Sequence, residues 1–476
     1  MSRTETPSPR ATVPDSGSAL DRYFHISERG STVRIEVMAG FATFLTMVYI
    51  LFVNPAILGA VKDPAGTSLP FDQVLTVTAL VAGAMTLLMG IYAKYPFALA
   101  AGLGLNAFVA FTLVGADKLS WPQAMGVIVV EGLIISALVL TGLREAVLNA
   151  IPMDLKRAIG IGIGLFITLI GLVNAGVVIH SDLSGTVVTL APDLTTLRIL
   201  TFALGLALTA TLVARKVPGS LLIGIVGTTV IGSVINALWG SGKIWASVGP
   251  GVAKLPSKWV SAPNFALVGN FSFSFFRALG FLTAVAIVVA VMLSDFFDTM
   301  GTVIGIGGEA KLLDREGKLP GMKKVLLVDS LAAAAGGAAS ASSNTTFIES
   351  AAGVGQGGRT GLTSVVVGIL FLLCLFLSPL AGVIPPEATA PVLVIVGYFM
   401  MTIVKDIEWS DPGMGIPVLL TMVMMPFTYI ITNGVGAGFL SYAVIAVLRG
   451  RAREVHPLMY VVSGIFLWYF CHGLLV

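Results

Sequence analysis

The sequence predicts an all-α polytopic membrane protein with about 14 transmembrane spans, arranged as two inverted repeats of about seven spans each. Apolar residues make up 56% of the 476 residues, charged residues only 11%, and the mean hydropathy is +0.94. Stretches of roughly 20 mostly apolar residues, the length of a membrane-spanning helix, fill most of the chain. Two further apolar segments are interrupted by glycine and small polar residues, which is typical of transporters built from inverted repeats.

The expected spans follow from the apolar runs in chain order. They cover residues 36–58, 74–93, 122–142, 158–179, 199–213, 219–238, 277–300, 322–341, 361–384, 387–404 and 456–474. Residues 413–449 form either one bent span or a helical hairpin around Asn433, so counts of about 14 and about 15 spans both stay open.

The predicted organisation is a disordered cytoplasmic tail over residues 1–30 and one transmembrane domain over residues 31–476. Its first repeat covers about 31–240 and its second about 276–476. The tail has no apolar core, so it is not a signal peptide. Lys and Arg gather around residues 144–157, 215–216 and 311–324, which the positive-inside rule places in the cytoplasm together with the N-terminus. We expect a multi-pass protein of the inner (cytoplasmic) membrane.

Two spans are expected to be broken, the third and the tenth. Residues 96–115 follow Pro96 and are too short and too rich in glycine to cross as one regular helix. Residues 336–361 have the same character, with small residues, Ser/Thr caps and a glycine-rich exit. Each segment should contain a short extended piece followed by a half-helix, and a pair of such breaks marks a binding site.

Asp295 and Asp298 are the strongest functional candidates. They are three positions apart in an apolar run and so lie on one helix face, with no cation near them in sequence. A carboxylate in a membrane helix costs roughly 2.5–3.5 kcal/mol and is a functional hypothesis by default. The pair would bind substrate and a coupling proton. The alternative is a water-exposed helix end.

Glu349 and Asn106 are the polar residues of the two interrupted segments. A carboxylate accepts neighbouring N–H groups and an amide both donates and accepts, a combination that suits a flat heterocycle. Glu349 is also a candidate for proton coupling. The alternatives are a carboxylate that only caps a helix, and an amide that only satisfies the break.

The remaining candidates are aromatic and acidic. Phe296 and Phe347 could stack on the faces of a ring, although most phenylalanines in such a chain face lipid or core. Glu131 and Asp329 lie in apolar runs, either as proton relays or as hydrogen-bonding partners of a neighbouring helix, and the structural role is favoured.

Other classes of protein are disfavoured. The four histidines have no other metal-ligating residues at a suitable spacing in the sequence, and the two cysteines lie in apolar surroundings. GIGIG at residues 160–164 lacks the preceding strand of a dinucleotide site. We therefore expect that the protein is not an enzyme, binds no cofactor or metal, and has no nucleic acid partner.

Five stretches of the sequence resemble the AzgA-like purine permeases, a branch of the nucleobase–cation symporter family. They are MAGFATFLTMVYILFVNPAIL (38–58), AGLGLNAFVAFTLV (101–114), SDFFDTMGTVIGIGGEA (294–310), SSNTTFIESAAGVGQGGRTGLTSVVVGILFLLCLFLSPL (342–380) and GRAREVHPLMYV (450–461).

The resemblance implies a core domain and a gate domain, frequent assembly as a dimer, and uptake of adenine, guanine or hypoxanthine with protons. It places the family's eighth-span acids on Asp295 and Asp298, the tenth-span acid on Glu349 and the third-span asparagine on Asn106. The alternatives are a transporter of the same fold for uracil, xanthine or an anion, and a channel.

Overall fold

The computed structural model describes residues 18–142, 151–180, 188–239, 243–246, 252–254, 258–314, 319–381 and 383–471. The elements up to residue 240 are α1 (Ala19–Phe24), α2 (Val33–Met47), α3 (Ile50–Leu58), α4 (Phe71–Leu88), η1 (Met89–Ala93), β1 (Leu99–Ala101), α5 (Leu103–Ala107), η2 (Phe108–Ala116), α6 (Trp121–Thr141), α8 (Met153–Asn174), β2 (Val178–His180), β3 (Val188–Leu190), α9 (Leu197–Ala214) and α10 (Ser220–Leu238). The later elements are α11 (Phe275–Leu279), α12 (Phe281–Glu309), α13 (Met322–Ala338), β4 (Asn344–Thr346), α14 (Ser350–Gly355), α15 (Gly361–Leu373), η3 (Cys374–Phe376), α16 (Ser378–Ala381), α17 (Pro386–Met401), η4 (Thr402–Asp406), α18 (Pro412–Thr428), α19 (Ile431–Leu448), η5 (Ala452–Glu454) and α20 (Pro457–Cys471).

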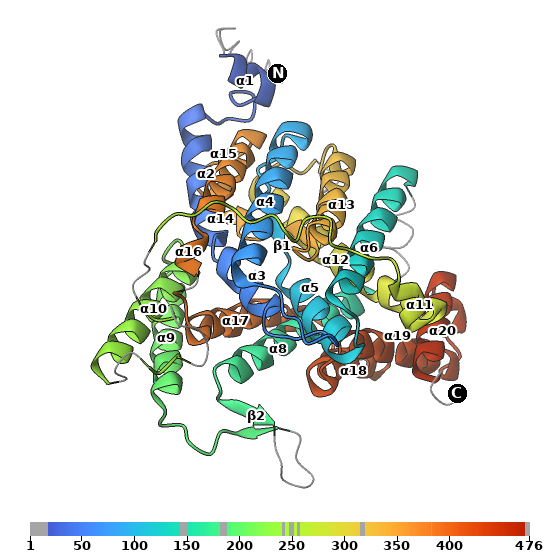
Figure 1. Ribbon diagram of the computed structural model, residues 1–476. Coiled ribbons are helices and arrows are strands. Elements are labelled where there is room, and N and C mark those ends of the chain that lie inside the picture. Colours follow the sequence, from blue (N-terminus) through green and yellow to red (C-terminus); the bar gives the residue numbers. More distant parts are fainter. Residues whose placement is uncertain are drawn as a thin grey trace, which may run out of the picture.

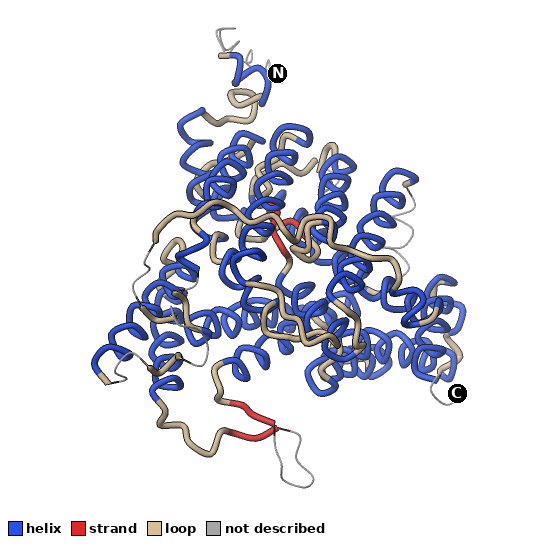
Figure 2. The backbone as a smooth tube through the Cα atoms, viewed as in Figure 1, coloured by secondary structure: helices blue, strands red, loops and turns tan. Residues whose placement is uncertain are grey.

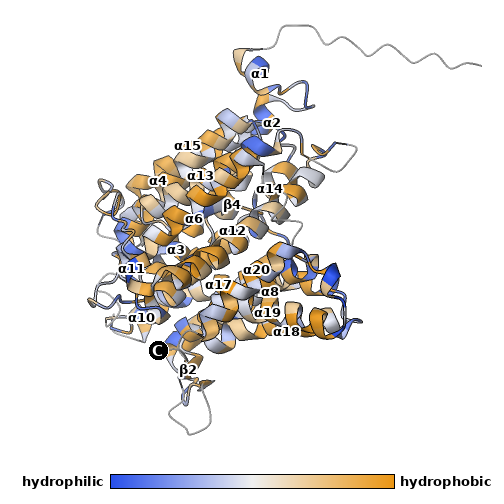
Figure 3. Cartoon of the chain, turned by 90° about the vertical axis from the view of Figure 1, so that its right-hand side faces the viewer, coloured by the Kyte–Doolittle hydropathy of each residue, from blue (hydrophilic) through white to orange (hydrophobic). Residues whose placement is uncertain are grey.

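The molecule is mostly helical, with two short two-stranded sheets (Figures 1 and 2). Within the described residues, nine helices are long and apolar enough to cross a membrane, and four shorter helices of 10–17 residues are also apolar. Hydrophobic residues cover the helices, and many of the hydrophilic residues lie in the connections (Figure 3). The chain is therefore a multi-pass membrane protein, as expected.

The predicted disordered tail is too long at its C-terminal end. Residues 1–17 lie outside the described part of the chain, but residues 19–24 form α1, capped by the side chain of Ser18. Phe24 and Ile26 are buried against Leu362. The segment before α2 is thus packed on the protein, because apolar side chains follow the polar start of the tail.

Residues 413–449 form a helical hairpin rather than one bent span. Helices α18 and α19 pack along each other, and Tyr429 between them adopts the left-handed conformation with φ 60°. This excludes one bent span, and it places the turn of the hairpin at Tyr429 rather than around Asn433, which lies within α19. α20 follows as a further apolar helix.

The helices form two packed groups. We call α2, α3, α4, α6, α12, α13, α14 and α15 the ribbon group. Helices α3, α4, α12 and α13 contact the sheet of β1 and β4, and the other four pack on these helices or on one another. We call α8, α9, α10, α17, α18, α19 and α20 the flanking group, in which α8 packs on both α17 and α18. In Figure 1 much of the ribbon group lies above α8, α17, α18, α19 and α20.

The β1–β4 ribbon joins the two segments that the sequence marks as interrupted. Leu99 pairs with Thr346 and Ala101 with Asn344, antiparallel. Gly102 N–H donates to the Ser343 carbonyl at 2.9 Å, which extends the pairing. Helix α5 follows β1 and α14 follows β4. Backbone N–H and C=O groups in an apolar interior need partners, and these two extended pieces supply them to each other.

A break between α2 and α3 positions Tyr49. The N–H groups of Leu51 and Phe52 bond to the carbonyls of Val48 and Tyr49, three residues back, at 3.1 and 3.0 Å. Such tight turns interrupt the regular helical hydrogen bonds and reorient the chain. The Tyr49 side chain consequently turns towards α14, where it is 1% exposed.

Glycines hold α4 and η1 close to α15. An added Cβ at Gly368 would lie 2.8 Å from the Gly83 carbonyl oxygen, and one at Gly90 would lie 2.5 Å from the Gly361 carbonyl oxygen. These contacts join backbone to backbone at two points seven residues apart on each segment. Small residues allow such close helix packing in membranes.

Gly368→Ala is therefore expected to destabilise the protein by about 1–3 kcal/mol, because backbone atoms must move to admit the methyl group. The check is the unfolding midpoint of the purified protein followed by intrinsic fluorescence. Gly160→Ala on α8 is the matched control, since nothing lies within 4 Å of its added Cβ. Equal midpoints for both variants would show that the α4–α15 contact is not tight.

Candidate functional site

Glu349 lies at the start of α14 and is held by Tyr49. The Tyr49 hydroxyl donates to Glu349 Oε1 at 2.6 Å. The Thr46 hydroxyl donates to the Glu349 carbonyl at 3.4 Å. The Glu349 side chain is partly exposed and the neighbouring Ile348 is 54% exposed. The carboxylate is thus oriented by one fixed donor and still has acceptor capacity for a ligand.

Asp298 on α12 is the second acid of this site. Its side chain is exposed, and it is near enough to both Glu349 and Tyr49 to interact with them electrostatically. An exposed acid within a long apolar helix offers an acceptor that a ligand can reach. The Glu349 carboxylate, held by Tyr49, and the Asp298 carboxylate on α12 therefore lie near each other.

Asp295 does not share this position, although it is three residues from Asp298. It is 1% exposed and its carboxyl group lies within hydrogen-bonding reach of the Glu131 carboxyl group on α6. The structure thus pairs Asp295 with Glu131, and Asp298 with the Glu349 region. Asp295 and Asp298, which the sequence predicts to act as one pair, therefore lie in two different environments.

Asp329 on α13 has a structural position. Its carboxylate accepts from the Thr346 N–H at 2.9 Å, the Thr346 hydroxyl at 2.8 Å and the Thr299 hydroxyl at 2.7 Å. These bonds fix β4 to α12 and α13. The structural role favoured from sequence agrees with this arrangement.

Asn106 on α5 is completely buried, and within the described part of the chain neither its amide nitrogen nor its amide oxygen has a hydrogen-bond partner. Buried polar atoms are rarely left unsatisfied, so an orphaned amide needs an explanation such as a water or a ligand. Its position in the segment after β1 is comparable to that of Glu349 after β4.

Phe296 and Phe347 are buried, with 2% and 6% of their surfaces exposed. Both belong to the large hydrophobic core cluster, as does Phe108. None of the three presents an open ring face in this conformation, and their place in the core is the more common one for phenylalanine.

Tyr49 is the site residue that the sequence does not single out. It lies in an apolar run. The later Pro55 is the sequence signal that could have indicated an irregular helix there, and the break itself lies at Val48. Among the described residues, no group of three His, Cys, Asp or Glu side chains is arranged to hold a metal ion.

This combination of features defines a class of protein. Two extended segments pair inside a multi-pass helical protein, and acids lie beside them. Paired breaks and acids within membrane helices are typical of membrane transporters.

Comparison with known proteins gives the family. Residues 34–436 match the Permease family, and the chain belongs to it. It is 39% identical to the adenine permease AdeP of Escherichia coli strain K12, over 96% of this chain and 97% of that protein. It is 38% identical to the guanine/hypoxanthine permease PbuG of Bacillus subtilis strain 168, over 95% of this chain and 99% of that protein. The resemblance to purine permeases is confirmed, and the protein is a transporter rather than an enzyme.

A solved structure shares the fold. The transmembrane domain of a cyanobacterial bicarbonate transporter, BicA, superposes with a TM-score of 0.57 at 13% identity, covering 85% of this chain and 97% of that one. The likeness concerns the fold alone.

Proposed function

We propose that this protein is a secondary active transporter that imports the purine nucleobases hypoxanthine, guanine and adenine, by proton symport with alternating access. The observation that carries the proposal is the placement of Glu349 and Asp298 beside the paired breaks, with Tyr49 orienting Glu349. The names of the relatives, adenine permease and guanine/hypoxanthine permease, favour purines over uracil.

The chemistry of the site suits a neutral base. A purine carries ring N–H groups that a carboxylate accepts, and charge-assisted bonds of this kind are about twice as strong as neutral ones. Asn106, whose amide has no partner among the residues that the structure describes, would donate to and accept from the same base. An anion site would instead be expected to present cations. The shared fold with a bicarbonate transporter therefore does not extend to its cargo.

Helix packing supports two repeats of about seven spans. Most of the main helix contacts in one half have a counterpart in the other when α2–α3, α4, β1–α5, α6, α8, α9 and α10 are matched with α12, α13, β4–α14, α15, α17, α18 and α19. For example, α6 packs on α13 as α15 packs on α4, and α8 packs on α18 as α17 packs on α9. The segments containing β1 and β4 would be the broken third and tenth spans. α20 has no counterpart, so the repeats would cover about 31–240 and 276–448, with α20 additional.

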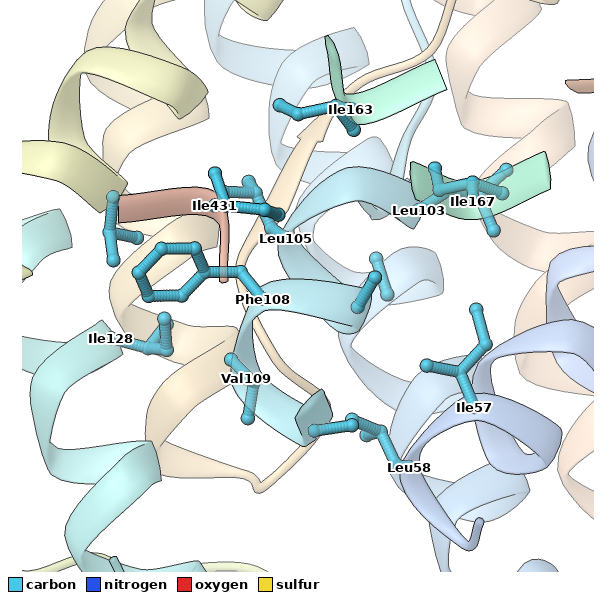
Figure 4. Packing of buried hydrophobic residues seen from close by; sticks show 14 of the residues in the cluster. Ile57, Leu58, Leu103, Leu105, Phe108, Val109, Ile128, Ile163, Ile167 and Ile431 are labelled. Atoms are coloured by element: carbon cyan, nitrogen blue, oxygen red, sulfur yellow. The ribbon is translucent and has the colours of Figure 1, made fainter. Parts of the chain in front are cut away.

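The ribbon and flanking groups correspond to the core and gate domains of the proposal. Leu105 and Phe108 of the ribbon side meet Ile163 of α8 and Ile431 of α19 (Figure 4). An aromatic cluster of Phe111 with Phe166 and Tyr429 continues this contact. Such an apolar contact can shift without breaking directional bonds, as alternating access requires.

Basic residues support a cytoplasmic N-terminus. Arg29 donates to the carbonyls of Lys94 and Arg359, and Lys324 lies over the ring of Tyr92. These contacts gather cations from four segments on the side of α1. The positive-inside rule makes this side cytoplasmic, in the inner membrane.

A homodimer is also part of the proposal, from the family resemblance. Leu204 of α9 and Val226 and Val230 of α10 are 43%, 51% and 57% exposed. These apolar side chains would face lipid or a second copy.

The test is uptake of radiolabelled hypoxanthine, guanine, adenine and uracil into proteoliposomes with and without an inward proton gradient. We expect saturable purine uptake that depends on the gradient. Flux without saturation would indicate a channel, and uptake of uracil alone would overturn the proposed cargo.

A further inference from the structure

A pair of buried carboxyl groups lies apart from the proposed base site. Glu131 is in the middle of α6 and Asp295 in α12, and they are 0% and 1% exposed. The two carboxyl groups lie within hydrogen-bonding reach of each other. Such contact between two acids far apart in the sequence is created by the packing of α6 on α12.

The carboxyl oxygens of Glu131 and Asp295 have almost no hydrogen-bond donors around them. Among the described residues, no N–H or O–H group donates to either oxygen of Asp295 or to Oε1 of Glu131. The Ser343 hydroxyl approaches Glu131 Oε2 at 3.5 Å, which is a long contact. Two ionised carboxylates in this position would repel each other without compensation, whereas one proton lets one group donate to the other.

The charged groups around the pair are acids. Asp329 and Asp298 interact electrostatically with Asp295, and Asp329 also with Glu131. The Asp329 carboxylate already accepts hydrogen bonds from the Thr299 hydroxyl and the Thr346 N–H. Glu349 accepts one hydrogen bond, from the Tyr49 hydroxyl. Among the described residues of α12, α13 and the start of α14, the cations are Lys323 and Lys324 in the first turn of α13, where Lys323 donates to the Leu140 carbonyl at the end of α6 rather than to the pair.

The other elements packed against α12 carry charges only near their ends. These are Asp154, Lys156 and Arg157 in the first turn of α8, and Arg277 in the short α11. Helices α5, α19 and α20 have no charged residue within their bounds. A proton is thus the compensating charge available to the pair.

We propose that Glu131 and Asp295 together hold the coupling proton, while Asp298 and Glu349 bind the base; this inference rests on the proposed transport function. The O–H bond forms when a proton enters from one side and breaks when the proton leaves to the other, with no change of oxidation state. Loss of the proton leaves two like charges between α6 and α12.

The pair is connected to the proposed base site through Ser343. Ser343 contacts Glu131 with its side chain, and its carbonyl accepts from Gly102 N–H at 2.9 Å. Gly102 precedes α5, which contains Asn106. A change in the charge of the pair therefore reaches the ribbon that carries both halves of the base site.

The experiment compares two transport modes in proteoliposomes, using the base that wild type transports. One mode is accumulation driven by a proton gradient, and the other is exchange of labelled for unlabelled base at equal pH on both sides. For Glu131→Gln, we expect the ratio of accumulation to exchange to fall about tenfold, a common size for coupling between two ligands. Base-induced proton uptake, read with a pH dye inside the vesicles, should fall in parallel.

Thr141→Ala is the matched control, since Thr141 is exposed at the end of α6 and its hydroxyl donates to the Ala137 and Leu138 carbonyls of the same helix. Glu131→Asp should restore part of the coupling because it keeps an acid in place. An unchanged ratio in Glu131→Gln would overturn the proposal.

A second measurement is independent of transport. Infrared spectra of wild type should contain the C=O band of a protonated buried carboxyl group, and this band should be absent from Glu131→Gln or, if that variant does not fold, from Asp295→Asn. A wild type without such a band contradicts the proton pair. A wild type with the band that transports no purine contradicts the proposed function instead.

Discussion

Glu349→Gln is expected to abolish uptake of the base by the purified protein in proteoliposomes. The substitution keeps the size of the side chain but removes the negative charge that accepts N–H groups. Loss of charge-assisted hydrogen bonds costs about 3 kcal/mol, which is roughly a hundredfold in affinity. The measurement is initial uptake against base concentration.

Because the Tyr49 hydroxyl donates to Glu349, a substitution of Tyr49 should lower the affinity for the base by a smaller amount. Tyr49→Phe removes the hydroxyl that donates to Glu349 Oε1 but keeps the carboxylate. Affinity should fall about tenfold, less than in Glu349→Gln. Glu408→Gln, at an exposed acid between η4 and α18, is the control and should transport like wild type. Normal affinity in Glu349→Gln would remove Glu349 from the site.

Asp298→Asn is expected to have the second large effect. Asp298 is exposed near Glu349, so it can contact a base directly. Asparagine replaces one acceptor oxygen by a donor, and a donor that faces the N–H of a base is repelled. Uptake should fall roughly a hundredfold, by a loss of about 3 kcal/mol in binding.

The control for this variant is Asp193→Asn, which changes an exposed acid in the loop before α9. The effect should be on base affinity, measured as exchange at equal pH. A variant with normal affinity but lost dependence on the proton gradient would instead assign the proton to Asp298.

The sequence predicts much of the fold because spanning helices leave a direct hydropathy signal. The extended pieces at Leu99–Ala101 and Asn344–Thr346 lie within the two interrupted segments. The hairpin at Tyr429 could not be distinguished from a bend, because a non-glycine residue with positive φ has no signal in the sequence. The sequence does not indicate α1 for a similar reason, since a short helix within a polar tail is defined by its packing.

The sequence predicts which residues are candidates for the site, but not which of them lie together. Residues three positions apart on a helix differ by about 60° around its axis, enough to turn Asp295 to α6 and leave Asp298 exposed. Glu131 and Tyr49 come from other helices, and the sequence does not show which helices touch. The burial of Phe296 and Phe347 was equally hidden, because apolar runs look the same whether they face core or site.

The most direct measurement is an experimental structure of the wild-type protein in a lipid disc with its transported purine bound. The base is predicted to lie beside the β1–β4 ribbon, with its N–H groups within hydrogen-bonding distance of the Glu349 and Asp298 carboxylates. A base bound elsewhere, or in contact with neither carboxylate, would contradict the proposed site.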